Sequence, residues 1–184
     1  MKINTEKYYI DVAVTAAGAV ILSAVAFAVK GARYLPTAVT LSALLLCIAQ
    51  TDMVKGFIPN RYVLLMAVPA VLNFVQRAAG GEDVGTLLVS RLVGFFICSV
   101  PLLAAAVLTR GAGVGGGDIK LMAAAGVLLG ASRVVYAFLI GTLAVIPAII
   151  FNAVRSMATQ TEKRKQYRMG PFLAAGIWIV YLIF

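Results

Sequence analysis

The chain has 184 residues, of which 62% are hydrophobic and 12% charged, and its formal net charge is +9. A soluble domain is about half apolar and about a quarter charged, so this composition excludes a water-soluble globular fold. The absence of histidine also excludes Ser/His and Cys/His catalysis and most metal sites. We therefore expect an all-α, polytopic integral membrane protein of about six to seven transmembrane helices with short loops, with no metal and no cofactor.

Seven apolar segments follow one another along the chain, and each is a candidate membrane span. They lie at 10–29, 37–51, 62–75, 84–108, 119–131, 134–154 and 172–184. The fifth and the seventh are short for about 30 Å of hydrocarbon. No linker or low-complexity tract separates the segments, so residues 1–184 are predicted to form a single membrane-embedded domain.

The basic residues are distributed unequally when successive loops are placed on alternate sides of the membrane. One side receives 11 of the 16 lysines and arginines, and the positive-inside rule puts that side in the cytoplasm. The basic residues form no stripe with interleaved aromatics, so we expect them to contact lipid headgroups and not nucleic acid. The larger group is Lys2, Lys7, Lys55, Arg61, Arg110, Lys120, Arg155, Lys163, Arg164, Lys165 and Arg168; the smaller is Lys30, Arg33, Arg77, Arg91 and Arg133.

Asp52 lies at the end of the second apolar segment. It is followed by Gly56 and then by Pro59 and Asn60, residues that stop a helix and turn the chain. An ionisable residue within or beside a membrane span is costly, so Asp52 is a candidate functional residue.

Asp118 opens the fifth apolar segment, directly after Gly115, Gly116 and Gly117. Glycine lets another backbone approach closely, so these glycines are expected to lie beside an extended substrate or to move aside for it. Lys120 is close enough in sequence to favour the ionised form of the carboxylate, although a lysine here also reaches lipid headgroups. Taken alone, Asp118 is explained equally well as a helix cap.

The charge count places Asp52 and Asp118 at the same, cytoplasmic, membrane surface. Two carboxyl groups brought together in a poorly solvated place can share one proton, which is the chemistry of an aspartic protease. An acid is stabilised at a helix N-terminus and destabilised near a C-terminus. Our hypothesis is therefore that Asp118 ionises more readily and that Asp52 holds the proton.

These segments together resemble the type IV prepilin peptidase family, which are membrane aspartic proteases with a GxGD motif. Residues 52–60 are similar to the family's first motif, residues 115–121 to its second, and residues 170–176 to the segment that opens its last helix. The resemblance implies that Asp52 and Asp118 are the catalytic aspartates. Substrate binding or loop support would come from Gly115, Gly116, Gly117, Pro59, Asn60 and Lys120.

The resemblance implies an aspartic endopeptidase that removes the basic leader from prepilins or pseudopilins. It would act at the cytoplasmic face of a bacterial or archaeal inner membrane, with the substrate's apolar helix among its spans, and residues 1–184 would be a single peptidase domain. The paired CxxC motifs of the methyltransferase domain in larger members are absent from the sequence, so we expect the short form. Membrane lipids are expected partners, and the oligomeric state is not predicted.

Two alternatives remain open from the sequence. A presenilin-like or signal-peptide-peptidase-like protease also uses a GxGD motif, but here Thr51 precedes the first aspartate where that group has tyrosine, and Pro171-Phe172-Leu173 stands in place of its Pro-Ala-Leu segment. A proton-coupled transporter would use membrane carboxylates as relays. The sequence shows no convincing internal repeat of the kind that many transporters have.

Overall fold

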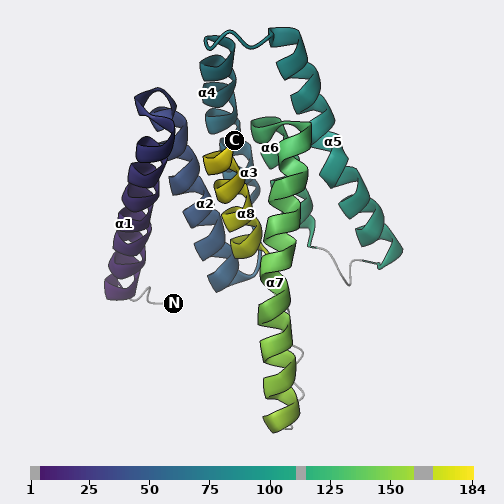
Figure 1. Ribbon diagram of the computed structural model, residues 1–184. Coiled ribbons are helices and arrows are strands. Elements are labelled where there is room, and N and C mark those ends of the chain that lie inside the picture. Colours follow the sequence, from purple (N-terminus) through teal and green to yellow (C-terminus); the bar gives the residue numbers. More distant parts are fainter. Residues whose placement is uncertain (1–4, 111–114, 160–167) are drawn as a thin grey trace.

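The computed structural model describes residues 5–110, 115–159 and 168–184, and of residues 5–11, 148–149 and 151–159 it describes the backbone alone. Within these ranges every regular element is a helix, which confirms the predicted all-α class (Figure 1). The elements are α1 (Thr5–Lys30), the 3-10 helix η1 (Ala32–Tyr34), α2 (Leu35–Lys55), α3 (Asn60–Leu65), α4 (Ala67–Ala78), α5 (Val84–Leu108), α6 (Gly116–Leu129), α7 (Ala131–Thr159) and α8 (Gly170–Ile183).

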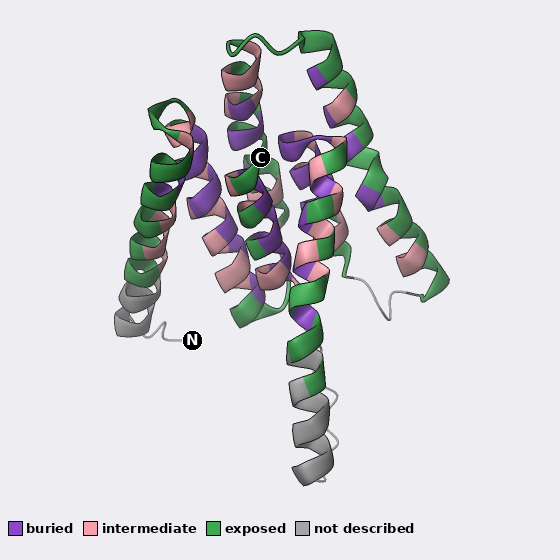
Figure 2. Ribbon diagram, in the orientation of Figure 1, coloured by how far each residue is buried: buried purple, intermediate pink, exposed green. Residues whose placement is uncertain are grey.

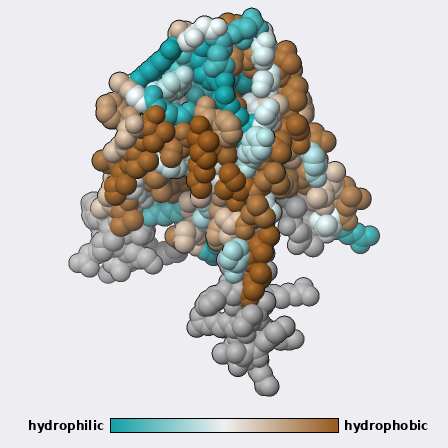
Figure 3. Space-filling view, in the orientation of Figure 1, coloured by the Kyte–Doolittle hydropathy of each residue, from teal (hydrophilic) through white to brown (hydrophobic). Residues whose placement is uncertain are grey.

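The outer surface of the bundle is that of a membrane protein. Within the described residues α1, α2 and α5 are long and apolar enough to cross a bilayer, and α8 and the first part of α7 are shorter apolar helices. The side chains of Val20, Ile21 and Leu92 are each more than 60% exposed. Figure 3 shows that such residues form a hydrophobic belt below a hydrophilic end. A lipid environment is what makes so much exposed apolar surface stable.

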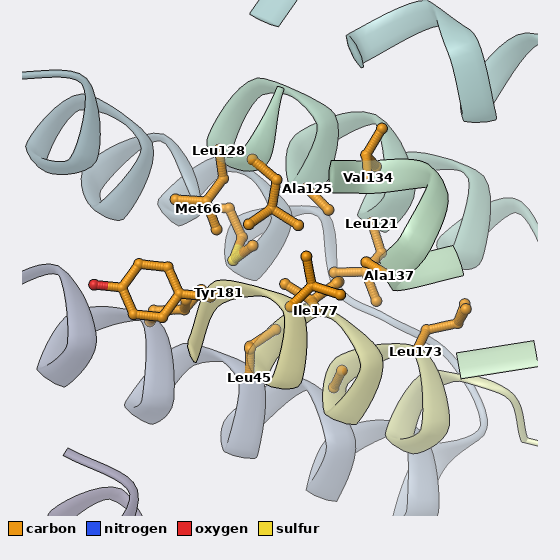
Figure 4. Packing of buried hydrophobic residues seen from close by; sticks show 14 of the residues in the cluster. Leu45, Met66, Leu121, Ala125, Leu128, Val134, Ala137, Leu173, Ile177 and Tyr181 are labelled. Atoms are coloured by element: carbon orange, nitrogen blue, oxygen red, sulfur yellow. The ribbon is translucent and has the colours of Figure 1, made fainter. Parts of the chain in front are cut away.

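The core lies around α8, which is enclosed by α2, α6 and α7 (Figures 1 and 2). Leu173, Ile177 and Tyr181 of α8 are buried, and Figure 4 shows them packed with Leu45 of α2 and Leu121 of α6. Because α2 and α6 both contact α8, the elements that carry the two candidate aspartates are held against one central helix.

Small residues allow the closest helix contacts. A Cβ on Gly126 of α6 would lie within 2.0–2.8 Å of the backbone of Gly94 and Phe95 in α5, so no larger side chain fits there. Between membrane helices, where lipid tails are as apolar as leucine, such close packing is a main source of association. These glycines therefore fix α6, and with it Asp118, against α5.

The third apolar segment, 62–75, is predicted as a single span, but the structure divides it into α3 and α4. The break lies at Leu65 and Met66, one turn before Pro69. A proline ring conflicts with the carbonyl four residues earlier, which here belongs to Leu65. Pro101 and Pro147, by contrast, lie inside the continuous helices α5 and α7.

The helix α7 begins directly after Gly130, whose φ of 85° separates it from α6, and continues to Thr159. It therefore continues beyond the end of the sixth predicted apolar segment, 134–154. Residues 160–167, which include Lys163, Arg164 and Lys165, lie outside the part of the chain that the structure describes.

Candidate active site

Asp52 lies in the last turn of α2 and is buried, with 6% of its surface exposed. Its backbone carbonyl accepts a hydrogen bond of 2.9 Å from the N–H of Gly56, which has a left-handed φ of 71° and ends the helix. The helix stop predicted from the sequence is therefore present, and it holds Asp52 one turn before the chain leaves α2.

The Asp52 side chain points at the beginning of α8. The backbone N–H of Gly170, the first residue of α8, donates a hydrogen bond of 3.2 Å to Oδ2 of Asp52. A Cβ on Gly170 would lie 2.7–3.0 Å from three atoms of the Asp52 side chain, so only glycine allows this approach. The N-terminus of α8, with its partial positive charge, therefore stabilises a negative charge on Asp52.

Sequence reasoning missed this contact. Gly170 begins the third segment of the family resemblance, but nothing in its local sequence names a partner 118 positions away. Two sequence features together could have indicated it. Gly170-Pro171 is typical of the start of a helix, where backbone N–H groups are free, and Asp52 near the end of its own helix needs a hydrogen-bond donor from elsewhere.

Asp118 is in the first turn of α6 and is half-buried. Its backbone N–H donates to the carbonyl of Gly115 at 3.0 Å, and a Cβ on Gly115 would lie 3.1 Å from Oδ2 of Asp118. The carboxyl group thus folds back over the loop that precedes the helix. Asp118 stands ahead of the apolar part of α6, and burial, followed by repulsion from the Asp52 carboxylate, raises its pKa to about 6.

The segments that follow the two aspartates pack against each other. Ile58 is buried, and its side chain would be 3.1 Å from a Cβ on Gly117. The ammonium of Lys120 donates a hydrogen bond of 3.0 Å to Oδ1 of Asn60. Pro59, with φ at −64°, precedes α3 and directs Asn60 toward α6. Two motifs that are remote in sequence thus form one site at one end of the bundle.

The predicted supporting residues have different surroundings. Gly115 and Gly117 are each closely approached by a side chain, whereas a Cβ on Gly116 would meet nothing within 4 Å. The ammonium of Lys120, which is close in sequence to Asp118, donates its hydrogen bond to Asn60. Residues 111–114, the first part of the predicted glycine-rich loop, lie outside the described residues.

The geometry favours the reverse of the expected proton order. Asp52 receives an N–H from the start of α8, which stabilises its ionised form, while the pKa of Asp118 is raised by burial and by the Asp52 charge. The sequence hypothesis considered only the helix to which each acid belongs, and α8 is a third helix that acts on Asp52.

The groups at this site are suited to proton transfer. Two carboxyl groups that interact electrostatically can hold one proton between them and exchange protons with a water molecule. In the part of the chain that the structure describes, no three His, Cys, Asp or Glu side chains lie close enough to hold a metal ion.

Comparison with known proteins agrees with these motifs. A model of the type IV leader peptidase family matches residues 39–150, which include both aspartates. A prepilin leader peptidase/N-methyltransferase of Bacillus subtilis (strain 168) is 31% identical over 167 residues, which cover 88% of this chain. The chain spans 63% of the length of that relative. No solved structure matches significantly. The two matches confirm the predicted family resemblance.

Proposed function

The chain belongs to the type IV leader peptidase family, and we propose that Asp52 and Asp118 are its catalytic dyad. The single observation that supports this best is the meeting of the two motifs at one end of the bundle, with the Asp52 carboxylate close enough to repel that of Asp118. Residues 1–184 would then act as a single membrane-embedded aspartic endopeptidase domain.

In the proposed mechanism Asp52 is the carboxylate and Asp118 holds the proton. Asp52 takes a proton from a water molecule, which attacks the carbonyl carbon of the scissile peptide bond. Asp118 donates a hydrogen bond to the carbonyl oxygen and steadies the negative charge that develops on it. When the tetrahedral intermediate breaks down, a proton is returned to the leaving amine, and the two acids regain one shared proton.

The proposed substrate is a prepilin or a pilin-like precursor, with a basic leader followed by an apolar helix. The apolar helix would pack among the membrane helices, and the leader junction would lie beside Gly116, where the surface is open. The excess of basic residues on the aspartate side supports an active site at the cytoplasmic face of the inner membrane.

The direct test is incubation of the purified protein with a leader-bearing pilin precursor. Asp52→Asn and Asp118→Asn should each lower the rate on the order of a thousandfold, because each removes one partner of general acid–base catalysis. Turnover near the wild-type rate in either variant would refute the dyad. Asp83→Asn is the matched control, since Asp83 is exposed at the other end of the bundle and asparagine also caps helices well.

The position of the cut separates the two kinds of GxGD protease. Mass spectrometry of the products should place the cleavage at the junction between the basic leader and the apolar helix. Cleavage deep inside the apolar helix would favour a presenilin-like or signal-peptide-peptidase-like activity. Proton-driven flux in proteoliposomes without proteolysis would favour the transporter alternative.

A further inference from the structure

The end of the bundle away from the two aspartates gathers cations from several elements. We call it the basic end, and Figure 3 shows a hydrophilic surface there above the apolar belt. Its cations are those that the sequence placed on the less basic side of the membrane. They come from α1, η1, α4, α5 and α7 and are, in chain order, Lys30, Arg33, Arg77, Arg91 and Arg133.

Three of these five cations have acceptors within the protein. Arg91 donates to the carbonyls of Ala70 and Val127 at 3.0 and 2.8 Å and to Oδ1 of Asn73 at 2.9 Å. Arg33 donates to the carbonyl of Gln76 at 2.6 Å. Arg77 forms a two-point ion pair with Glu82.

Lys30 and Arg133 are different. Both are half-buried, and no carboxylate of the described residues lies within 4 Å of either. The Lys30 ammonium lies 4.8 Å from the centre of the Tyr181 ring and 5.2 Å from that of Tyr34. The Arg133 guanidinium lies 6.0 Å from the Phe184 ring. These rings stabilise the cations without neutralising them.

The two cations converge on one pocket. Lys30 and Arg133 line it together with Arg77, Asn73 and the tyrosines Tyr34 and Tyr181. The three cations are near enough to repel one another. The pocket therefore combines converging positive charge with amide and hydroxyl groups, over an apolar base that includes Leu128 and Val180.

The helix dipoles do not supply the missing negative charge. Of the described helices, α1, α4, α6 and α8 end here and α2, α5 and α7 begin here, so the dipoles leave a net charge of about −0.5. Against the five cations stand the side-chain carboxylates of Glu82 and Asp83 and the terminal carboxyl group at Phe184. Phe184 lines the pocket, but its carboxyl group lies more than 4 Å from Lys30 and Arg133. Part of the positive charge is therefore uncompensated by the described residues.

We propose that this pocket binds a phosphate group, held by Lys30 and Arg133 with Arg77 beside them. A phosphate accepts charge-assisted hydrogen bonds from both an ammonium and a guanidinium. The pocket is lined both by cations and by apolar residues such as Leu128 and Val180, a combination expected at the level of lipid headgroups. In a membrane the phosphate is that of an anionic phospholipid, and in detergent solution inorganic phosphate can take its place.

The test measures the melting temperature of the purified protein in neutral detergent at constant ionic strength. Phosphatidylglycerol, phosphatidylcholine and sodium phosphate are each titrated. Phosphatidylglycerol should raise the melting temperature of the wild type much more than phosphatidylcholine. The double variant Lys30→Gln/Arg133→Gln should need at least about tenfold more phosphatidylglycerol for the same rise. A rise with sodium phosphate alone that this variant loses would also support the site and would assign it to free phosphate.

Two further variants make the result decisive. Arg61→Gln/Arg110→Gln removes the same charge at the other end and should respond as the wild type does. Lys30→Arg/Arg133→Lys keeps both charges and should retain binding, which tests the site even where the glutamine variant fails to fold. The proposal is overturned by equal responses of wild type and the glutamine variant, by equal effects of the two lipids without a response to sodium phosphate, or by no response to any of the three titrants.

Discussion

The two ends of the bundle differ in how many hydrogen-bond and ion-pair partners their charged residues have. At the basic end Arg91 has three acceptors, and Arg33 and Arg77 each have partners of their own. At the aspartate end, among the described residues, Asp52 has one backbone donor, Gly170, and no side chain donates to Asp118. Buried charge is stabilising only when its partners are complete. The three partnered arginines thus contribute stability, whereas the proposed dyad at the aspartate end would keep its carboxyl groups available for chemistry at a cost in stability.

Replacing Arg91 with methionine should have the largest effect on folding. The change removes three hydrogen bonds from a charged donor and leaves the Val127 carbonyl, in the last turn of α6, without a partner. We expect a loss of about 3 kcal/mol or more, because hydrogen bonds to charged groups contribute about 1.5–3 kcal/mol each. Unfolding in mixed micelles, followed by the fluorescence of Trp178, measures it.

The control for Arg91 is Arg61→Met, since Arg61 is exposed. Its effect should stay within about 0.5 kcal/mol. Cleavage per folded molecule should be near the wild-type rate for both variants. Equal stability of Arg91→Met and wild type would remove the contrast between the two ends.

The converse change at the aspartate end is Gly170→Ala, which should reduce activity. The new methyl group would occupy the place of the Asp52 carboxyl, which is 2.7–3.0 Å away, and would push it from its hydrogen bond to α8. Misplacement of a catalytic group by about 1 Å can cost on the order of a hundredfold in rate. We expect that loss in kcat/KM for the pilin precursor. A rate within threefold of wild type would show that α8 does not position Asp52.

Both ends show how far the sequence alone could go. The apolar segments and the helix stop at Gly56 predicted the helices around Asp52, because length, hydropathy and local conformation are sequence properties. The motifs predicted that Asp52 and Asp118 would share a site. What could not be predicted depends on tertiary packing: the donor from Gly170, the bond between Lys120 and Asn60, and the break at Met66.

The proton order illustrates the same limit. An acid near the end of its own helix is predicted to be poorly stabilised as an anion, and that reasoning favoured Asp118 as the ionised residue. The beginning of a different helix opposes that preference, and only the packing of α8 against α2 reveals it.

Asp118→Asn should stabilise the folded protein at neutral pH. The pKa of Asp118 is raised from 3.8 to about 6 on folding, so the fold favours the neutral form. This contribution is fully present below about pH 4 and is lost as the pH rises through 6. The asparagine stays neutral, so the variant should be more stable than wild type at pH 8. A change of about two pKa units corresponds to about 3 kcal/mol, and the partial exposure of Asp118 to solvent reduces the expected difference to about 1–2 kcal/mol.

The pH dependence distinguishes this from a simple packing effect. The stability difference between Asp118→Asn and wild type should shrink between pH 7 and pH 4. A difference that is constant over this range would contradict a raised pKa. Combining the change with Asp52→Asn should reduce the difference at pH 8, because repulsion from Asp52 is one of its two causes.

The smallest effect should come from a pair of matched glycine variants. Gly117 and Gly116 are neighbours in the first turn of α6, so alanine should favour the helix at both by up to about 1 kcal/mol. At Gly117 the new Cβ would be 3.1 Å from Ile58, so the two motifs must separate by a few tenths of an ångström. At Gly116 nothing lies within 4 Å.

We therefore expect Gly117→Ala to lower kcat/KM about three- to tenfold, which corresponds to about 1 kcal/mol in the barrier. Gly116→Ala should melt at or slightly above the wild-type temperature, so any fall in its activity must arise from contact with the substrate. If KM rises in Gly116→Ala while kcat is unchanged, the open surface beside Gly116 is where the substrate backbone binds. Equal losses in both variants, with equal melting temperatures, would show that the contact between Ile58 and Gly117 does not hold the dyad together.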